Sequence, residues 1–392
     1  MYGFGIILQM DFSGNHKTPK IWFPSSKKHS TILPKSSKKL PKKSIFSWKQ
    51  ALFPYSKNKF YFRELHMKRI LTWIKPTGSE LHLGNYFWAL KPFITMQNEN
   101  TDSEFFLFLA NMHGFTQTQE AEILKKNSMT IVKLYLACGA DMAKTLIYNP
   151  AEIPGHAQLN WALTCLTIMG TMERMHSYKD ALAKGKSGEI SVGTFCYPIL
   201  MAADILLYDA DFVPVGKDQK QHVEYARDIA QKFNANYGET FKIPEPLINT
   251  EVATIIGTDG RKMSKSYNNY IGLLEEENSM LKKIKQIPTN AKTVEEPKNP
   301  DECNVYQLTK LFLTPEEDQE LRRKYEAGGL SYKVAKDYLF EKMRETLQPI
   351  QAKFKEISEN EVSKMLHEHS EKANAIAKKK IQEVYKKIGF FL

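Results

Sequence analysis

The sequence has few cysteines, and none of the four stands in a C-x-x-C pair. This scatter excludes a disulfide framework and a cysteine-based zinc site, and it indicates reduced thiols in a reducing compartment. Long apolar runs are missing too: no stretch of about 18 uncharged apolar residues occurs, so no membrane-spanning segment is expected. The ten histidines do not cluster as metal ligands, and we expect His367 and His369 to face solvent. We therefore expect neither a protein-bound metal nor a membrane association.

Acidic residues are almost missing from residues 1–66. This segment holds 13 basic and two acidic side chains, which account for the whole net charge of +11, while residues 67–392 hold 42 of each sign. It is rich in Lys, Ser and Pro without a helix or strand period, so we expect a disordered extension. Three interpretations stay open: an organelle transit peptide, a basic tail for RNA, or codons upstream of a true start at Met67. We expect a cytoplasmic protein, or an organelle protein if the first interpretation holds.

From Lys68 onward, apolar runs of strand length alternate with helical patterns. Strands are expected at 69–74, 104–110, 146–148 and 212–215, and helices at about 84–96, 118–139, 158–173 and 176–185. This alternation is typical of an α/β fold with a doubly wound parallel sheet. Beyond residue 275 the pattern is helical only, so we expect a Rossmann-like domain over 67–274 and an all-helical C-terminal domain over 275–392.

One expected helix carries an unusual set of side chains. It is expected to start at Pro198, because proline fits the first helical turn, and to continue to residue 208. Tyr197, Met201 and Asp204 are spaced four and three apart, so they share one face. Most of their neighbours are apolar, and a carboxylate is costly to bury there unless a donor bonds to it. Asp204 is therefore either a ligand-binding carboxylate or a helix-end side chain that reaches water.

The next segment resembles a nucleotide-binding turn. The strand 212–215 ends in Gly216, and a helix begins near Asp218. A strand, a glycine turn and a helix N-terminus form the usual place for a nucleotide in an open α/β sheet.

Two short motifs point to phosphate chemistry. His82-Leu83-Gly84-Asn85 opens a helix, and Lys262-Met263-Ser264-Lys265-Ser266 lies in a turn-rich loop over 257–268. A glycine at a helix start lets a nucleotide approach the backbone, and the helix N-terminus favours phosphate charge. His82 can donate to a phosphate oxygen. Lys262 and Lys265, on a flexible loop, can close over a pyrophosphate leaving group as its charge develops.

With these two motifs in this order, residues 67–392 resemble the class I aminoacyl-tRNA synthetases, and within them the bacterial-type tryptophanyl-tRNA synthetases. The resemblance includes PTGSELHLGNY, YPILMAADILLYDADFVPVGKDQKQHVEYARD, DGRKMSKSYNN and PKNPDECNVYQLTKLF. It implies that L-tryptophan is activated with ATP to tryptophanyl-adenylate and pyrophosphate and is then transferred to tRNA(Trp). It also implies that Mg²⁺ arrives with ATP and that the chain forms a homodimer whose helical domain lies on the anticodon side of the tRNA.

The resemblance also assigns roles to individual residues. In the tryptophan pocket, Asp204 accepts the indole N–H and Met201 packs on the ring, together with Tyr197, Gln219 and His113. The catalytic residues are His82, Lys262 and Lys265. The ATP-binding residues are Lys75, Pro76, Thr77, Gly84, Asn85, Gly216, Lys217, Asp218, Ile255, Lys262, Met263, Ser264, Lys265 and Ser266. For His113, a buried histidine on an apolar face stays the alternative.

Some residues depart from the family pattern. Trp73 and Trp88 stand where the family usually has glycine, and Asn111 stands where aspartate is frequent. Two other functions therefore stay open: a catalytically silent paralogue that binds tryptophan or RNA, and a tyrosine–tRNA ligase. The latter is disfavoured by Met201, because the tyrosyl relatives generally have glutamine at that position.

Overall fold

The computed structural model describes residues 68–76, 78, 81–183, 187–216, 219–248 and 255–391, and all of them belong to one compact unit. The predictions for residues 1–66, Met67, Thr77, Lys217 and Asp218 lie outside the described residues. Among the described helices, none is both long and apolar enough to cross a membrane.

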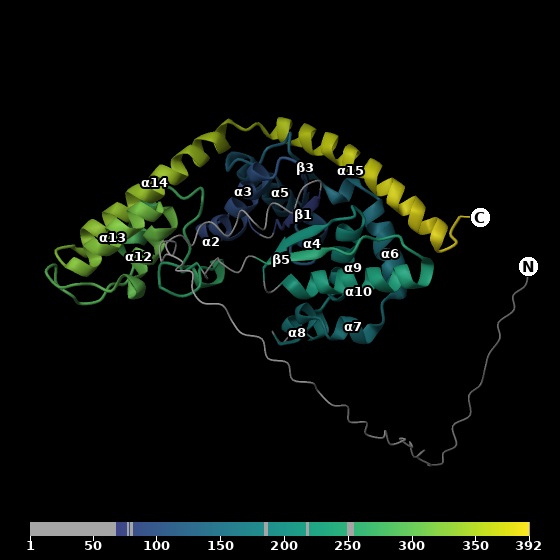
Figure 1. Ribbon diagram of the computed structural model, residues 1–392, viewed down its shortest axis with the longest axis horizontal. Coiled ribbons are helices and arrows are strands. Elements are labelled where there is room, and N and C mark those ends of the chain that lie inside the picture. Colours follow the sequence, from purple (N-terminus) through teal and green to yellow (C-terminus); the bar gives the residue numbers. More distant parts are fainter. Residues whose placement is uncertain are drawn as a thin grey trace, which may run out of the picture. The chain divides into compact units, whose positions relative to one another are not determined.

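Five parallel strands form the central sheet (Figure 1). They are β1 (Arg69–Ile74), β2 (Glu104–Leu109), β3 (Thr145–Tyr148), β4 (Phe212–Val215) and β5 (Glu245–Ile248). Their order in the sheet is β3-β2-β1-β4-β5, so the direction of winding reverses between β1 and β4. Such a reversal opens a crevice at the carboxyl ends of the two strands, where ligands bind in open α/β sheets. The doubly wound sheet predicted from the alternating pattern is confirmed.

The sequence pattern did not predict β5. This strand has four residues, Glu-Pro-Leu-Ile, and pairs only with β4, so it forms one edge of the sheet. Pro246 cannot donate to a ladder hydrogen bond, and proline is tolerated in strands mainly at such edges. A short run that contains proline does not show a strand period, and only pairing with β4 defines it.

Helices cover both faces of the sheet. They are α2 (Leu83–Asn85), the π-helix η1 (Tyr86–Leu90), α3 (Lys91–Glu99), α4 (Asn111–Gly114), α5 (Ala121–Ala137), α6 (Gly155–Leu166), α7 (Met169–Glu173), α8 (His176–Ala183), α9 (Val192–Leu206), α10 (Lys220–Tyr237), α11 (Glu277–Lys285), α12 (Asn304–Thr309), α13 (Pro315–Ala327), α14 (Tyr332–Glu356) and α15 (Glu359–Lys387). The helix predicted over 158–173 is two helices, because the chain extends at Thr167 and Ile168.

Side chains of β1 alternate between two buried cores. Ile70 belongs to the core that also contains residues of α3 and α5, whereas Leu71 belongs to the core beneath α6, α9 and α10. The first core continues without interruption into α11, α12 and α14, so these C-terminal helices share apolar contacts with the sheet. The division into domains at residue 275 stays a prediction.

Helix α9 begins earlier than the sequence suggested. It starts at Val192, and the Ser191 side chain caps it by accepting the backbone N–H of Thr194 at 3.1 Å. The prediction that it starts at Pro198 is wrong, since Pro198 lies inside the helix. A serine N-cap satisfies a free backbone donor and so fixes the start, while the proline costs one hydrogen bond within a helix that is buried on one face.

Helix α15 covers the other edge of the sheet. Its His369 Nδ1 accepts the backbone N–H of Ile147 at 3.0 Å, and its Ser370 Oγ accepts that of Asn149 at 3.0 Å. Both groups belong to or follow β3, whose outer backbone donors have no strand partner among the described residues. The expectation that His369 faces solvent is therefore wrong, whereas His367 is exposed and lies 3.1 Å from Glu152.

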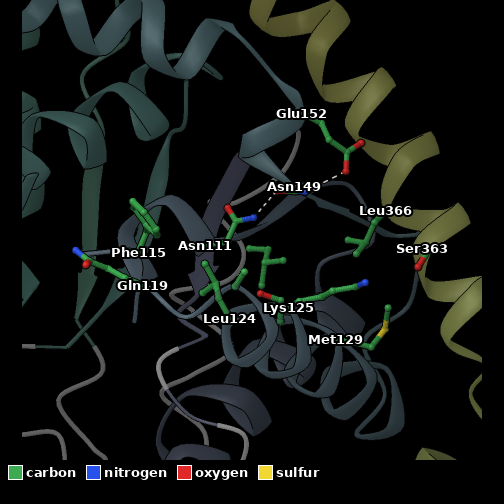
Figure 2. A pocket seen from close by; sticks show the side chains of 13 residues that line it. Asn111, Phe115, Gln119, Leu124, Lys125, Met129, Asn149, Glu152, Ser363 and Leu366 are labelled. Carbon is green, nitrogen blue, oxygen red and sulfur yellow. Dashed lines mark hydrogen bonds between the residues drawn. The ribbon is translucent and has the colours of Figure 1, made fainter. Parts of the chain in front are cut away.

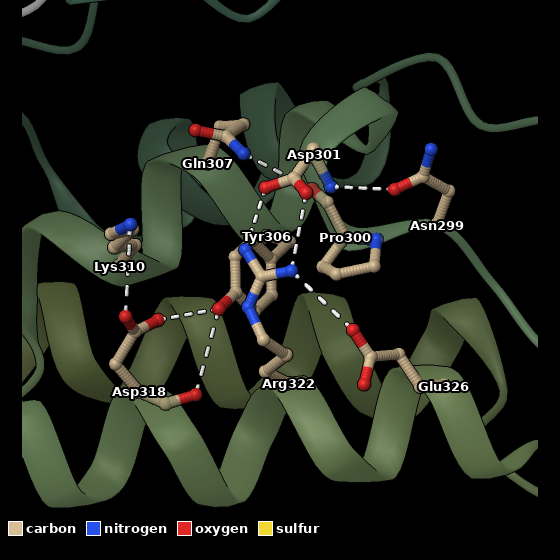
Figure 3. A network of polar contacts seen from close by, with 9 residues as sticks. All are labelled: Asn299, Pro300, Asp301, Tyr306, Gln307, Lys310, Asp318, Arg322 and Glu326. Carbon is tan, nitrogen blue, oxygen red and sulfur yellow. Dashed lines mark hydrogen bonds and ion pairs between the residues drawn. The ribbon is translucent and has the colours of Figure 1, made fainter.

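A polar network joins α12 and α13 (Figure 3). Arg322 on α13 forms a bidentate ion pair with Asp301, at 2.6 and 3.1 Å, and its guanidinium lies over the ring of Tyr306. The hydroxyl of Tyr306 donates to Asp318 at 2.5 Å. Because Arg322 and Asp301 are accessible to water, their pair contributes little to stability. The buried ring of Tyr306, packed edge-on against Tyr325, holds these two helices together.

Candidate active site

The two sequence motifs, far apart in the chain, lie side by side. Leu83 N–H donates to the Ile271 carbonyl at 2.9 Å, and Leu273 N–H donates to the Leu81 carbonyl at 2.8 Å. His82 also forms an isolated antiparallel bridge with Gly272. These backbone bonds attach the start of α2, which follows β1, to the segment just after the Lys262–Ser266 motif. The site therefore lies at the carboxyl end of β1, beside the reversal point of the sheet.

His82 closes the N-terminus of α2. Its Nδ1 accepts the backbone N–H of Asn85 at 3.3 Å, and the Asn85 side chain accepts the N–H of His82 at 3.1 Å, which makes a reciprocal capping box. Burial, and secondarily the positive charge of Lys265, lower the pKa of His82 to about 4. The ring is therefore neutral at pH 7. Because Nδ1 accepts a bond, the proton sits on Nε2, which can donate to a phosphate oxygen.

Gly84 lies against both motifs. A Cβ at this position would lie 2.9 Å from the His82 ring and 3.5 Å from the Met263 sulfur. The Gly84 N–H donates to that sulfur at 3.2 Å. The predicted role of Gly84 was to let a nucleotide approach the backbone. The structure adds a second requirement, since a side chain here would displace the His82 ring from its capping position.

The lysine motif is held by a tight hairpin. Met263 N–H donates to the Ile255 carbonyl at 2.9 Å, and Gly257 N–H donates to the Arg261 carbonyl at 2.7 Å. Ile255 and Met263 are buried at its base. Ser264 Oγ accepts the N–H of Ser266 at 3.2 Å and starts a short turn. The hairpin fixes the backbone on either side of Lys262.

Asn269 organises this loop, and the sequence reasoning gave it no role. Its side chain is 2% exposed; its amide donates to Asp259 at 2.6 Å and to the Lys262 carbonyl at 3.1 Å, and its oxygen accepts the Ser264 N–H at 2.8 Å. One side chain thus joins the turn of the hairpin to both ends of the Lys262–Ser264 stretch. The sequence signal was weak, because asparagine is common in loops.

Both lysines of the motif are exposed. The ammonium of Lys265 reaches the loop after β1, since a Cβ on Gly78 would be 2.5 Å from its Nζ. On the far side of that loop, Pro76 packs on Gly114 of α4, while Lys75 is exposed. Lys265 therefore already lies between the β1 loop and His82, where phosphates of a bound nucleotide would sit.

Asp204 lies at the centre of a second cluster. It is 1% exposed, and each carboxylate oxygen faces a histidine: His113 Nε2 at 2.6 Å and His156 Nδ1 at 2.5 Å. Burial alone would raise the pKa of Asp204, but the hydrogen bonds and charges of the two histidines outweigh it, and the pKa is lowered. Asp204 is thus an ionised buried carboxylate and does not reach water. Sequence reasoning missed His156, which no motif singled out.

Two other predicted pocket residues, Met201 and Tyr197, lie on the same helix as this carboxylate, and Gly216 and Gln219 lie at the turn between β4 and α10. Met201 is buried on the same face of α9. The ring of Tyr197 meets that of His113 edge-on at 6.0 Å, and its hydroxyl lies 3.1 Å from His222 Nε2. Gly216 is buried directly after β4, where Gln219 N–H donates to its carbonyl at 3.0 Å as α10 begins.

The residues that depart from the family pattern lie at three places. Trp73, at the carboxyl end of β1, faces the core beneath α9, and its ring lies 6.1 Å from that of Phe108. The ring centre of Phe108 in turn lies 6.5 Å from that of His113, so a single ring, that of Phe108, separates Trp73 from the Asp204 cluster. Trp88 is 36% exposed on η1. Asn111 donates to Asn149 at 2.8 Å.

A separate open pocket of about 500 Å³ lies at the carboxyl ends of β2 and β3 (Figure 2). It is lined by Leu109, Asn111, Phe115, Gln119, Ala121, Leu124, Lys125, Ser128, Met129, Asn149, Glu152, Ser363 and Leu366. Two of its amides are already bonded, Asn111 to Asn149 and Asn149 to Glu152. His113, on the same short helix α4, bonds to Asp204 instead. Among the described residues, no group of three or more His, Cys, Asp or Glu side chains could hold a metal ion.

Comparisons with known proteins agree with this geometry. A family model described as tRNA synthetases class I (W and Y) matches residues 65–386. The tryptophan–tRNA ligase of Campylobacter jejuni is 43% identical over 82% of this chain and 99% of its own length. That of Fusobacterium nucleatum is 44% identical, over 82% and 98%. A solved structure of tryptophanyl-tRNA synthetase from Campylobacter jejuni, complexed with ADP and tryptophan, has a TM-score of 0.76 at 43% identity and covers 82% of this chain and 99% of its own.

Proposed function

The chain belongs to the class I tRNA synthetases of the W and Y group, and from this premise we propose that it is a tryptophan–tRNA ligase. One observation carries the choice of amino acid: an ionised, fully buried carboxylate, Asp204, lies beside a buried thioether, Met201, on one face of α9. The indole nitrogen only donates, so an acceptor-only carboxylate suits it, and sulfur packs well on aromatic edges. The Campylobacter relative solved with tryptophan supports the same substrate.

In the first step, the carboxylate of tryptophan attacks the α-phosphorus of ATP in line. A bond forms between a carboxylate oxygen and phosphorus, the bond from phosphorus to the bridging oxygen breaks, and pyrophosphate leaves. The enzyme forms no covalent intermediate, so catalysis consists of positioning and stabilisation of charge. We assign His82 Nε2–H and the Lys265 ammonium to the phosphates, since the ammonium already lies against the loop after β1 and is near enough to His82 to lower its pKa. Lys262 approaches when the loop closes.

ATP binding involves the remaining predicted residues around this centre. Gly84 and Asn85 form the start of α2 beneath the adenosine, Ile255 packs near the adenine, and Gly216 begins the turn beside the ribose. We infer that ATP binds as its Mg²⁺ complex, in which the metal would offset phosphate charge, because phosphates and water satisfy most Mg²⁺ coordination in such sites.

In the second step, a hydroxyl at the 3′ end of tRNA(Trp) attacks the adenylate carbonyl, and AMP leaves. We propose that the enzyme works as a homodimer in the cytoplasm. Large apolar side chains are exposed around the end of α6: Trp161 by 62%, Ile168 by 63% and Met169 by 65%. Such a face fits a second copy of this chain. Trp161→Glu should convert a dimer to a monomer in light-scattering measurements, whereas an unchanged mass would place the interface elsewhere.

The function is tested by ATP–pyrophosphate exchange with tryptophan, with tyrosine and without amino acid. Exchange that depends on tryptophan alone is expected. Exchange with tyrosine would indicate a tyrosine–tRNA ligase. Tryptophan binding without any exchange would indicate a silent paralogue.

A further inference from the structure

A chain of polar contacts continues behind Asp204, away from the residues assigned to the substrate. His156, at the start of α6, is fully buried, and its Nδ1 lies 2.5 Å from Asp204 Oδ1. Its other nitrogen, Nε2, lies 2.9 Å from the hydroxyl of Tyr208. Tyr208 is also fully buried, and its ring packs at 5.1 Å from that of Tyr148. Three residues from two segments thus form one line inside the protein.

The direction of each hydrogen bond follows from the charge of the carboxylate. An ionised carboxylate only accepts, so the ring nitrogens that face Asp204 both carry hydrogen. His156 Nδ1 therefore donates to one oxygen of Asp204, and His113 Nε2 donates to the other. The second nitrogen of His156, Nε2, pairs with the Tyr208 hydroxyl, which fixes the orientation of the ring.

The two histidines leave each oxygen of Asp204 with one free acceptor site, which can accept a hydrogen bond from the substrate. Each oxygen has two acceptor sites, and one on each is taken by a histidine. A buried carboxylate with a single donor could turn about its side-chain bonds or carry a proton, and would then present a different atom to the substrate. With a donor on each oxygen, the plane of the carboxylate is fixed.

We propose that His156, backed by Tyr208, is a positioning residue that holds the Asp204 carboxylate in the plane in which it accepts the indole N–H. This inference rests on the proposed function, in which Asp204 reads tryptophan. His156 would then determine specificity without touching the substrate. Its effect should fall on the recognition of the indole nitrogen and leave the phosphate chemistry alone, because His82 and Lys265 belong to other segments.

An analogue without the indole N–H isolates this effect. In β-(benzothiophen-3-yl)alanine a sulfur replaces the N–H at nearly the same shape, so the analogue cannot donate to Asp204. Adenylate formation is measured by pyrophosphate exchange, giving kcat and KM for each amino acid. The compared quantity is the ratio of kcat/KM for tryptophan to that for the analogue, which a general loss of folding or of catalysis does not change.

Three variants of the full chain are compared with wild type. His156→Leu removes both hydrogen bonds at similar volume, and the ratio should fall about tenfold to a hundredfold, mainly through KM for tryptophan. His156→Asn should restore most of the ratio, because the asparagine amide can donate from near the Nδ1 position. His367→Leu is the matched control, since this histidine is exposed on α15, and it should leave the ratio unchanged.

The outcomes separate this inference from the function beneath it. A ratio that His156→Leu leaves unchanged, or that His156→Asn fails to restore after a loss, would overturn the positioning role while Asp204 keeps its own. If wild type does not prefer tryptophan over the analogue, Asp204 does not read the N–H, and both the pocket assignment and this inference fail. A ratio lost in His156→Leu and restored in His156→Asn supports the proposal.

Discussion

Replacing Asp204 by asparagine tests the tryptophan pocket most directly. The shape is kept, but one acceptor oxygen becomes an NH₂ group. Whichever way the amide points, that group faces a ring N–H of either His113 or His156. The facing histidine must therefore present a lone pair to that group and carry its hydrogen on the other ring nitrogen. His156 can do so, because Nε2–H can then donate to the oxygen of Tyr208 at 2.9 Å. We expect the variant to fold.

The cost should appear in tryptophan binding. The carboxylate is 1% exposed, so water cannot compensate for the loss of its charged hydrogen bond to the substrate. A hydrogen bond to a charged group contributes about 2–3 kcal/mol, which corresponds to a roughly 30- to 160-fold weaker Kd. The measurement is calorimetric titration with tryptophan, together with the KM for ATP, which should stay within about twofold since Asp204 lies in a different segment from His82 and Lys265. An unchanged Kd for tryptophan would refute the assignment of Asp204 to the indole nitrogen.

Four further predictions concern other parts of the site and the chain. Lys265→Ala should slow single-turnover adenylate formation by at least about a hundredfold with little change in tryptophan affinity, because its charge acts mainly in the transition state; a wild-type rate would show that this loop does not close on the phosphates. Asn269→Ala should also slow adenylate formation, by about tenfold or more, since it frees the loop that positions Lys265; an equal rate in single-turnover assays would make Asn269 purely structural. The pKa of His82 is about 4 in the folded protein, against an ordinary value of 6.5, so as the pH falls the unfolded state binds this proton first. The free energy of unfolding should therefore fall between pH 6.5 and 4 more in wild type than in His82→Gln. Parallel pH dependences of the two proteins in urea titrations would contradict this. A chain that starts at Met67 should melt cooperatively and catalyse exchange at the full-length rate, because it keeps all the described elements, of which the first is β1 at Arg69. Loss of either property would give residues 1–66 a role in folding or chemistry.

Local patterns in the sequence determined the fold class and both halves of the candidate site. Alternating strands and helices imply a parallel sheet, because each helical crossover returns the chain to the same end of the sheet, so successive strands run in one direction. Helical spacing put Met201 and Asp204 on one face of α9 before any contact was known. The His82–Asn85 motif and the Lys262–Ser266 motif could be recognised because their residues are consecutive in the sequence. All of these features depend on neighbours within a few positions.

Tertiary structure decided what lies opposite those residues. Asp204 finds His156 across 48 residues, and Ile147 finds His369 across 222. A histidine in a charged helix resembles a solvated one until it meets the unpaired edge of β3. β5 is a strand only because it pairs with β4, although its Pro246 cannot donate a ladder hydrogen bond. A hydrogen bond between distant segments depends on where the folded chain brings them together. The spacing of residues within either segment therefore cannot predict it.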